Sequence, residues 1–165
     1  MQIKYHTQQN VPMEFLIYLD VCCLNRPFDD QTQERIFLEA EAVLRILAIV
    51  QMGDWHLQGS ETFDDEVQNT PEGARKRQMQ IWAALAISKV NITQQIAFRG
   101  GELAQMGFKD YDALHIACAE AGKADVLLTT DDRMLRLAAR HKDLLQVRVE
   151  NPLQWLREVA NDRCE

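Results

Sequence analysis

Short apolar runs alternate with longer amphipathic stretches along this chain. The first run, Phe15 to Leu19, is rich in aromatic and aliphatic side chains and is typical of a buried strand. Similar short runs follow at Trp55 to Gln58, at Val126 to Thr129 and at Val147 to Val149. We expect these four segments to be strands, because each is too short for a helix of ordinary length.

The stretches between the runs carry apolar residues at helical spacing. Residues 32–52 present one continuous apolar face, and Gly53 follows in the position that glycine favours after a helix. Ser60 predicts the cap of a short helix through Glu66, and Pro71 predicts the first turn of another that reaches about Ser88. Residues 25–30 break the pattern and predict a loop. Further helices are expected at residues 93–106, 111–121, 132–141 and 152–159.

Strands that alternate with helices predict an α/β fold, a three-layer α/β/α sandwich around a mostly parallel central sheet. The 165 residues suit a single domain over residues 1–165, in which about residues 1–13 form a flexible or loosely packed N-terminal segment. The apolar runs are too short to span a bilayer, and the polar beginning does not resemble a signal peptide. A cytoplasmic protein without a membrane association is therefore expected.

Composition restricts the kinds of site that the chain can carry. The four cysteines and four histidines are scattered and form no CxxC pair, so a zinc site built from these residues is not expected. The formal net charge of -7 argues against a general nucleic-acid binder, which needs basic residues to neutralise phosphates. It does not exclude a nuclease, because acidic metal ligands add negative charge while basic residues cluster locally, as in Arg75 to Arg77.

Four acidic residues stand where predicted strands end or predicted helices begin, namely Asp20, Glu66, Asp112 and Asp131. Parallel strands present their carboxyl ends at one edge of the sheet, where ligands bind. Carboxylates that meet there repel one another, and either a raised pKa of one of them or a bound divalent cation relieves the repulsion. Oxygen ligands select hard cations, so the pattern predicts a site for Mg²⁺ or Mn²⁺.

Three of these acids also have a purely structural interpretation. Asp112 suits the N-terminus of a helix, Asp131 can cap the helix that follows it, and Glu66 can be a solvated helical residue. Asp20 is different, since no helix is expected after it and capping does not explain it. Together, four acids at four junctions favour a functional site.

The residues around these acids resemble the PIN-domain ribonucleases, which include the VapC-like toxins of bacterial toxin–antitoxin systems. The resemblance spans most of the chain. Ile17 to Asp20 looks like the strand that carries the first acid, and Ser60 to Glu66 looks like the segment of the second. Asp112 to Ala117 looks like the helix of the third acid, and Val126 to Asp131 like the strand that delivers the fourth.

The resemblance implies a metal-dependent endoribonuclease. Asp20, Glu66, Asp112 and Asp131 would hold one or two Mg²⁺ or Mn²⁺ ions, and a metal-activated water would cleave RNA to leave 5′-phosphate and 3′-hydroxyl ends. The resemblance also implies RNA as the substrate, an antitoxin protein as a partner and a homodimer. The alternative is a non-catalytic module of the same fold, which uses the acidic pocket to bind a metal or a partner in regulation.

Where two acidic residues compete for one position of the site, the resemblance to the family decides between them. Asp112 is preferred to Asp110, which is interpreted as a helix cap. Asp131 is preferred to Asp132, and Glu66 is preferred to Glu61. Val21 departs from the family, which commonly has a hydroxyl residue there that orients the first acid. His115 shares a helix face with Asp112, but we interpret it as a structural, hydrogen-bonded histidine.

Overall fold

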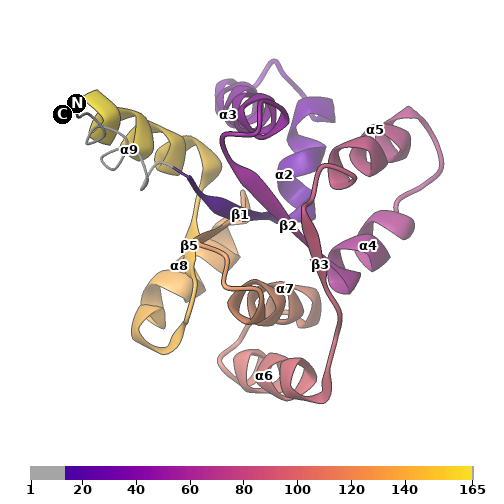
Figure 1. The fold of residues 1–165 in the computed structure, drawn as a ribbon, viewed down its shortest axis with the longest axis vertical. Coiled ribbons are helices and arrows are strands. Elements are labelled where there is room, and N and C mark those ends of the chain that lie inside the picture. The colour runs from indigo at the N-terminus through magenta and orange to yellow at the C-terminus, as the bar shows by residue number, and fades with distance from the viewer. Residues whose placement is uncertain (1–13, 165) are drawn as a thin grey trace, which may run out of the picture.

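The computed structural model describes residues 14–164, so the predicted flexible segment 1–13 lies outside the described residues. Its centre is a five-stranded, all-parallel sheet with the strand order β3-β2-β1-β4-β5 (Figure 1). The strands are β1 (Leu16–Leu19), β2 (His56–Ser60), β3 (Ser88–Val90), β4 (Val126–Leu128) and β5 (Arg148–Glu150).

The strand order creates a switch point beside β1. The chain runs from β1 to β2 and β3 on one side and then crosses to β4 and β5 on the other. β1 and β4 are neighbours, with Leu19 opposite Leu128, so the residues that follow them leave the sheet side by side. In open parallel sheets this is where ligands bind.

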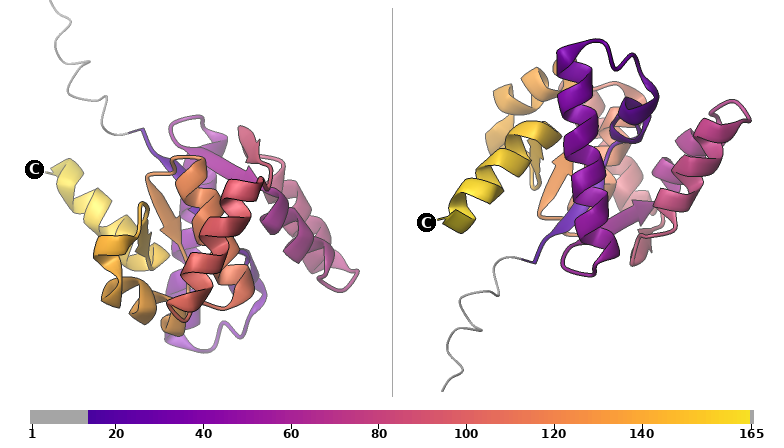
Figure 2. Two further views of the ribbon diagram at one scale, coloured as in Figure 1. Left: turned by 90° about the horizontal axis from the view of Figure 1, so that it is seen from below. Right: turned by 90° about the horizontal axis from the view of Figure 1, so that it is seen from above.

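Helices cover both faces of the sheet (Figure 1), which confirms the predicted three-layer fold. One face is covered by α2, α3, α5 and α9, and the other by α6, α7 and α8; Figure 2 shows α3 and α9 on one side and α6 and α7 on the opposite side. No helix among the described residues is long and apolar enough to cross a membrane. The helices are α2 (Val21–Asn25), η2 (Arg26–Phe28), α3 (Glu34–Gln51), α4 (Glu61–Gln68), α5 (Ala74–Ala83), α6 (Gln94–Gln105), α7 (Asp110–Ala121), α8 (Asp132–Arg140), η3 (Lys142–Leu144) and α9 (Pro152–Cys164).

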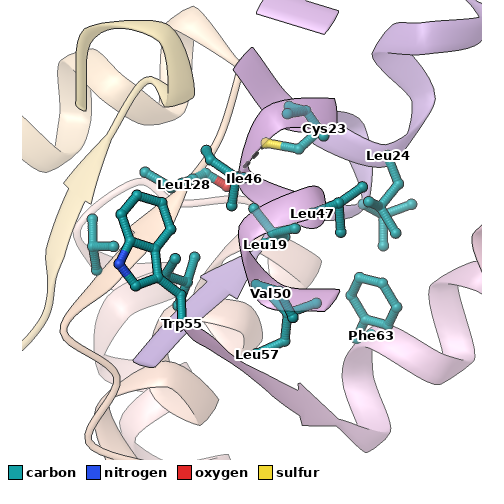
Figure 3. Packing of buried hydrophobic residues seen from close by; sticks show 14 of the residues in the cluster. Leu19, Cys23, Leu24, Ile46, Leu47, Val50, Trp55, Leu57, Phe63 and Leu128 are labelled. Atoms are coloured by element: carbon teal, nitrogen blue, oxygen red, sulfur yellow. Dashed lines mark hydrogen bonds between the residues drawn. The ribbon is translucent and has the colours of Figure 1, made fainter. Parts of the chain in front are cut away.

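The apolar face of α3 packs on the sheet as its sequence pattern predicts. Ile46 and Leu47 are fully or almost fully buried against Leu19 of β1 and Leu57 of β2 (Figure 3). Trp55 lies in the same cluster and contacts the ring of Trp155 from α9 edge-on, at 5.2 Å between ring centroids. This core holds the strand ends in fixed positions, because well-packed interiors leave little room for movement.

The prediction that no helix follows Asp20 is wrong, because helix α2 begins at Val21. Burial explains the difference: Val21, Cys23 and Leu24 are buried in the core, so this short segment packs as a helix that its sequence alone does not reveal. Asp20 is the N-cap residue of α2, but its side chain makes no capping hydrogen bond. Capping therefore still does not explain the Asp20 carboxylate.

The helix predicted from Pro71 to about Ser88 is also wrong at both ends. Helix α5 begins only at Ala74, after Gly73, whose φ of 151° is in the region that favours glycine. It ends at Ala83, and β3 then pairs with β2 through Gln58 and Ser88. Cross-strand pairing thus overrides the helical propensity of this segment.

The buried carboxylate of Glu39 connects three segments of the chain by hydrogen bonds. Glu39 of α3 is 1% exposed, and its Oε1 accepts a hydrogen bond of 2.9 Å from Nε of Arg26. Its Oε2 accepts from Nε of Arg35 at 3.3 Å and from Nδ2 of Asn151 at 2.6 Å. The carboxylate therefore connects η2, α3 and the start of α9.

We expect the Glu39→Gln substitution to lower the free energy of unfolding by about 2 kcal/mol, because it removes the charge that compensates two guanidinium groups. The loss is smaller than for a fully buried pair, since Arg26 and Arg35 still reach water. Urea denaturation measures it. Glu41→Gln on the exposed face of the same helix is the control and should change stability by less than about 0.5 kcal/mol. Equal effects of the two substitutions would contradict the stabilising role of Glu39.

Candidate metal centre

Asp20 leaves the carboxyl end of β1 and is 4% exposed. Its Oδ2 accepts hydrogen bonds from Thr129 Oγ1 at 2.8 Å and from the Cys22 thiol at 3.2 Å. Thr129 Oγ1 also accepts from the backbone N–H of Asp131 at 3.1 Å. These bonds fix the carboxylate in place and supply the orienting contacts that the apolar Val21 does not.

Glu66 reaches the same region from α4, the helix that follows β2. The start of α4 is fixed by Ser60, whose Oγ accepts from the Phe63 backbone N–H at 2.9 Å, as the sequence predicts. Glu66 Oε1 lies 2.7 Å from Nε2 of His115, and Asp20 Oδ1 lies 3.8 Å from the same nitrogen. One ligand atom from each of these three residues lies within 4.8 Å of the others.

His115 also belongs to this group, although the sequence predicts only a structural, hydrogen-bonded role for it. Its side chain is fully buried, and Nδ1 lies 2.6 Å from the Tyr18 hydroxyl. Burial alone lowers its pKa, but the hydrogen bond with Glu66 and the negative charges of Asp20, Glu66 and Asp112 outweigh burial and raise the pKa above the ordinary value. The spacing from Asp112 was the available signal, since residues three apart share a helix face.

Asp112 lies in the first turn of α7, one turn before His115. Its pKa is raised from 3.8 to about 6, first because the carboxyl is partly buried and then because of the charges of Asp20 and Asp131. The carboxylates are therefore close enough to repel one another. A divalent cation would remove that repulsion.

Asp131 follows β4 and is the N-cap of α8, where its Oδ1 accepts from the Met134 backbone N–H at 3.0 Å. Asp131 therefore caps the helix that follows it, as its structural interpretation predicts. Its charge nevertheless contributes to the raised pKa of Asp112, so it lies near that acid. A single carboxylate can perform both roles, because the cap uses only Oδ1.

Two of the three competing acids, Asp132 and Glu61, are engaged elsewhere. Both carboxylate oxygens of Asp132 accept from the guanidinium group of Arg35, at 2.6 and 2.8 Å. Glu61 Oε2 accepts from the Ile92 backbone N–H at 2.7 Å. Asp110 is exposed and is the first residue of α7 rather than its cap, so the predicted cap is wrong. The N-cap is Lys109, which makes no side-chain capping bond.

The donor set suits a hard divalent cation. Asp20 and Glu66 offer carboxylate oxygens within a small volume that also contains Nε2 of His115, and Asp112 adds negative charge beside Asp20. Carboxylates are the ligands that Mg²⁺ and Mn²⁺ prefer. The pKa of Asp112 is raised first by burial and then by the charges of Asp20 and Asp131, and a cation would relieve this second contribution.

Comparisons with known proteins agree with this geometry. A family model described as the PIN domain matches residues 17–140. Among solved structures, the chain is similar to VapBC2 from Rickettsia felis bound to a DNA fragment from their promoter, with 15% sequence identity and a TM-score of 0.51. The match covers 82% of this chain and 98% of the other. No curated protein matches the chain, and at this identity the likeness to the solved structure concerns the fold.

Proposed function

Because the chain belongs to the PIN-domain family, we propose that it is an endoribonuclease that cleaves RNA phosphodiester bonds with Mg²⁺ or Mn²⁺. Proteins with this domain are generally nucleases. The observation that carries the proposal is the convergence of Asp20, Glu66 and His115 at the switch point of the sheet, with Asp112 and Asp131 beside them.

We assign Asp20, Glu66, Asp112 and Asp131 to the cation. When bound, the cation would lower the pKa of a coordinated water and neutralise charge on the phosphate. Asp20 is held in position by hydrogen bonds from Thr129 and Cys22. Asp112 has the raised pKa, so it would release a proton as the cation binds and charge its carboxylate.

The partners are proposed from the family and from the structural neighbour. VapBC2 from Rickettsia felis is bound to a DNA fragment from their promoter. By analogy, we propose that this chain is the toxin of a toxin–antitoxin pair, that an antitoxin protein restrains it, and that it forms a homodimer in the cytoplasm. Cleavage of RNA distinguishes this proposal from the alternative, a non-catalytic regulatory module.

Removal of the metal tests the proposed activity. Protein treated with EDTA is expected to leave RNA intact, and added Mn²⁺ should restore cleavage to products with 5′-phosphate ends. End-labelled RNA separated on a denaturing gel measures both results. If Mn²⁺ raises the melting temperature but no RNA in a broad panel is cut, the non-catalytic metal-binding module is the better description. Cleavage that persists without any divalent cation would contradict the metal mechanism.

A further inference from the structure

A chain of buried hydrogen bonds lies directly behind the acidic site. Ser60 Oγ lies 2.6 Å from the Tyr18 hydroxyl, which in turn lies 2.6 Å from Nδ1 of His115. The other ring nitrogen, Nε2, lies 2.7 Å from Glu66 Oε1. Ser60, Tyr18 and His115 are all fully buried, whereas the side chain of Glu66 is 32% exposed.

The hydrogen bond between His115 and Glu66 has a fixed direction. A carboxylate can only accept, so Nε2 of His115 carries the hydrogen that faces Glu66. In the neutral ring Nδ1 is an acceptor and receives the Tyr18 hydroxyl, and the Ser60 hydroxyl donates to Tyr18. In the charged ring Nδ1 donates to the Tyr18 oxygen and the Tyr18 hydroxyl donates to Ser60, so the bond to Glu66 is the same in both states. Ser60 Oγ itself accepts from the Phe63 backbone N–H. Each of these buried groups is thereby satisfied.

Glu66 needs such a constraint more than the other acids do. Its long side chain extends from a helix, and its carboxylate faces the negative charge of Asp20, which favours rotamers that turn away from the site. The N–H of His115 opposes this tendency, because it binds Glu66 and lies 3.8 Å from Asp20. Helix α7 carries both Asp112 and His115, so one element fixes a proposed ligand and the histidine.

We propose that His115 is a positioning residue that holds Glu66 toward the cation, while Tyr18 and Ser60 fix the orientation of its ring. The inference rests on the proposed metal site but does not depend on cleavage of RNA. Partners of this kind, which orient a metal ligand without touching the metal, typically change metal affinity by about 10- to 100-fold when they are removed.

Calorimetric titration of the full, metal-free chain with Mn²⁺ tests the proposal. His115→Leu should weaken Mn²⁺ binding about 10- to 100-fold relative to the wild type. His115→Gln places an amide N–H near the position of Nε2 and should restore the affinity to within about threefold. Equal losses in the two variants would overturn the hydrogen-bond role in favour of direct ligation by the ring. Wild-type affinity in His115→Leu would overturn the proposal as well.

A double-mutant cycle separates action through Glu66 from a general effect. Glu66→Gln alone should weaken Mn²⁺ binding, and adding His115→Leu to it should cause little further loss. Fully additive losses would contradict the proposal. If His115→Leu does not fold, Tyr18→Phe replaces it, and loss of the hydroxyl that orients the ring should weaken binding about three- to tenfold. An unchanged affinity in Tyr18→Phe would then overturn the proposed chain.

The same titration distinguishes failure of this inference from failure of the proposed function. A wild-type chain that binds no Mn²⁺ overturns both. A wild-type chain that binds Mn²⁺ while His115→Leu binds it equally well overturns only the role of His115. Mn²⁺ binding that falls in His115→Leu and returns in His115→Gln supports the positioning role, whatever RNA the protein cleaves.

Discussion

Asp20→Asn is expected to reduce Mn²⁺-dependent RNA cleavage at least about 100-fold, the largest effect that we predict for a single substitution. Asp20 stands at the switch point of the sheet, and one of its carboxylate oxygens lies within 4.8 Å of a ligand atom of Glu66 and of His115. The amide has nearly the same shape, so it can still accept the hydrogen bond from Thr129. The loss therefore measures the charge of the ligand rather than the fold.

Asp132→Asn is the matched control, since Asp132 follows the neighbouring strand but pairs with Arg35 at the surface. It should keep cleavage within about threefold of the wild type, because surface ion pairs contribute little. Rates measured on one end-labelled RNA under single-turnover conditions compare the two. Equal activity of Asp20→Asn and the wild type would contradict the assigned role of Asp20.

Asp112→Asn is expected to stabilise the metal-free protein and to weaken its Mn²⁺ binding. The carboxyl has a pKa of about 6 in the folded chain, against an ordinary value of 3.8. The folded state therefore binds its proton more tightly, so the stability contributed by the neutral carboxyl falls as the pH rises from about 4 to about 6. Above pH 6 the charged group destabilises the fold, and the amide removes that penalty.

The expected gain is about 1 kcal/mol at pH 7.5, which is less than the pKa shift alone implies because water screens this partly exposed group. For a domain of this size the melting temperature should rise by about 2 to 4 °C in EDTA. At pH 4.5 the gain should fall to about a third, because the carboxyl is then mostly neutral in the folded state but already mostly charged in the unfolded state. Thermal unfolding at the two pH values measures both effects.

Two comparisons separate this effect from a general change in stability. Asp110→Asn alters an exposed acid in the same turn of α7 and should change the melting temperature by less than about 1 °C at either pH. Mn²⁺ should stabilise the wild type more than Asp112→Asn, because a ligand that binds the folded state raises its stability in proportion to affinity. A variant that is less stable than the wild type in EDTA at pH 7.5 would contradict carboxylate repulsion at this site.

The positions of four of the five strands could be predicted, because each rests on a local sequence signal. Short apolar runs mark β1 and β4, and in a parallel sheet the residues that follow them must meet at one edge. The proximity of Asp20 to Glu66 follows from the same rule once β2 is placed beside β1. Ser60 and Asp131 were recognisable as caps, since polar residues before helices commonly take that role.

The remaining features depend on contacts between distant parts of the chain. Strand β3 consists of Ser88, Lys89 and Val90, and only its pairing with β2 distinguishes it from the end of a helix. Helix α2 forms because Val21, Cys23 and Leu24 are buried. His115 shows no local sign of its bonds to Tyr18 and Glu66, which are 97 and 49 residues away in the sequence.

A crystal structure of the protein soaked with Mn²⁺ tests the proposed metal centre most directly, because the anomalous signal of manganese locates the ion independently of the protein atoms. We predict an anomalous peak at the carboxyl edge of β1 and β4, with ligand distances of about 2.2 Å to Asp20 and to at least two of Glu66, Asp112 and Asp131. An absence of manganese at this edge, with the four carboxylates turned apart, would contradict it.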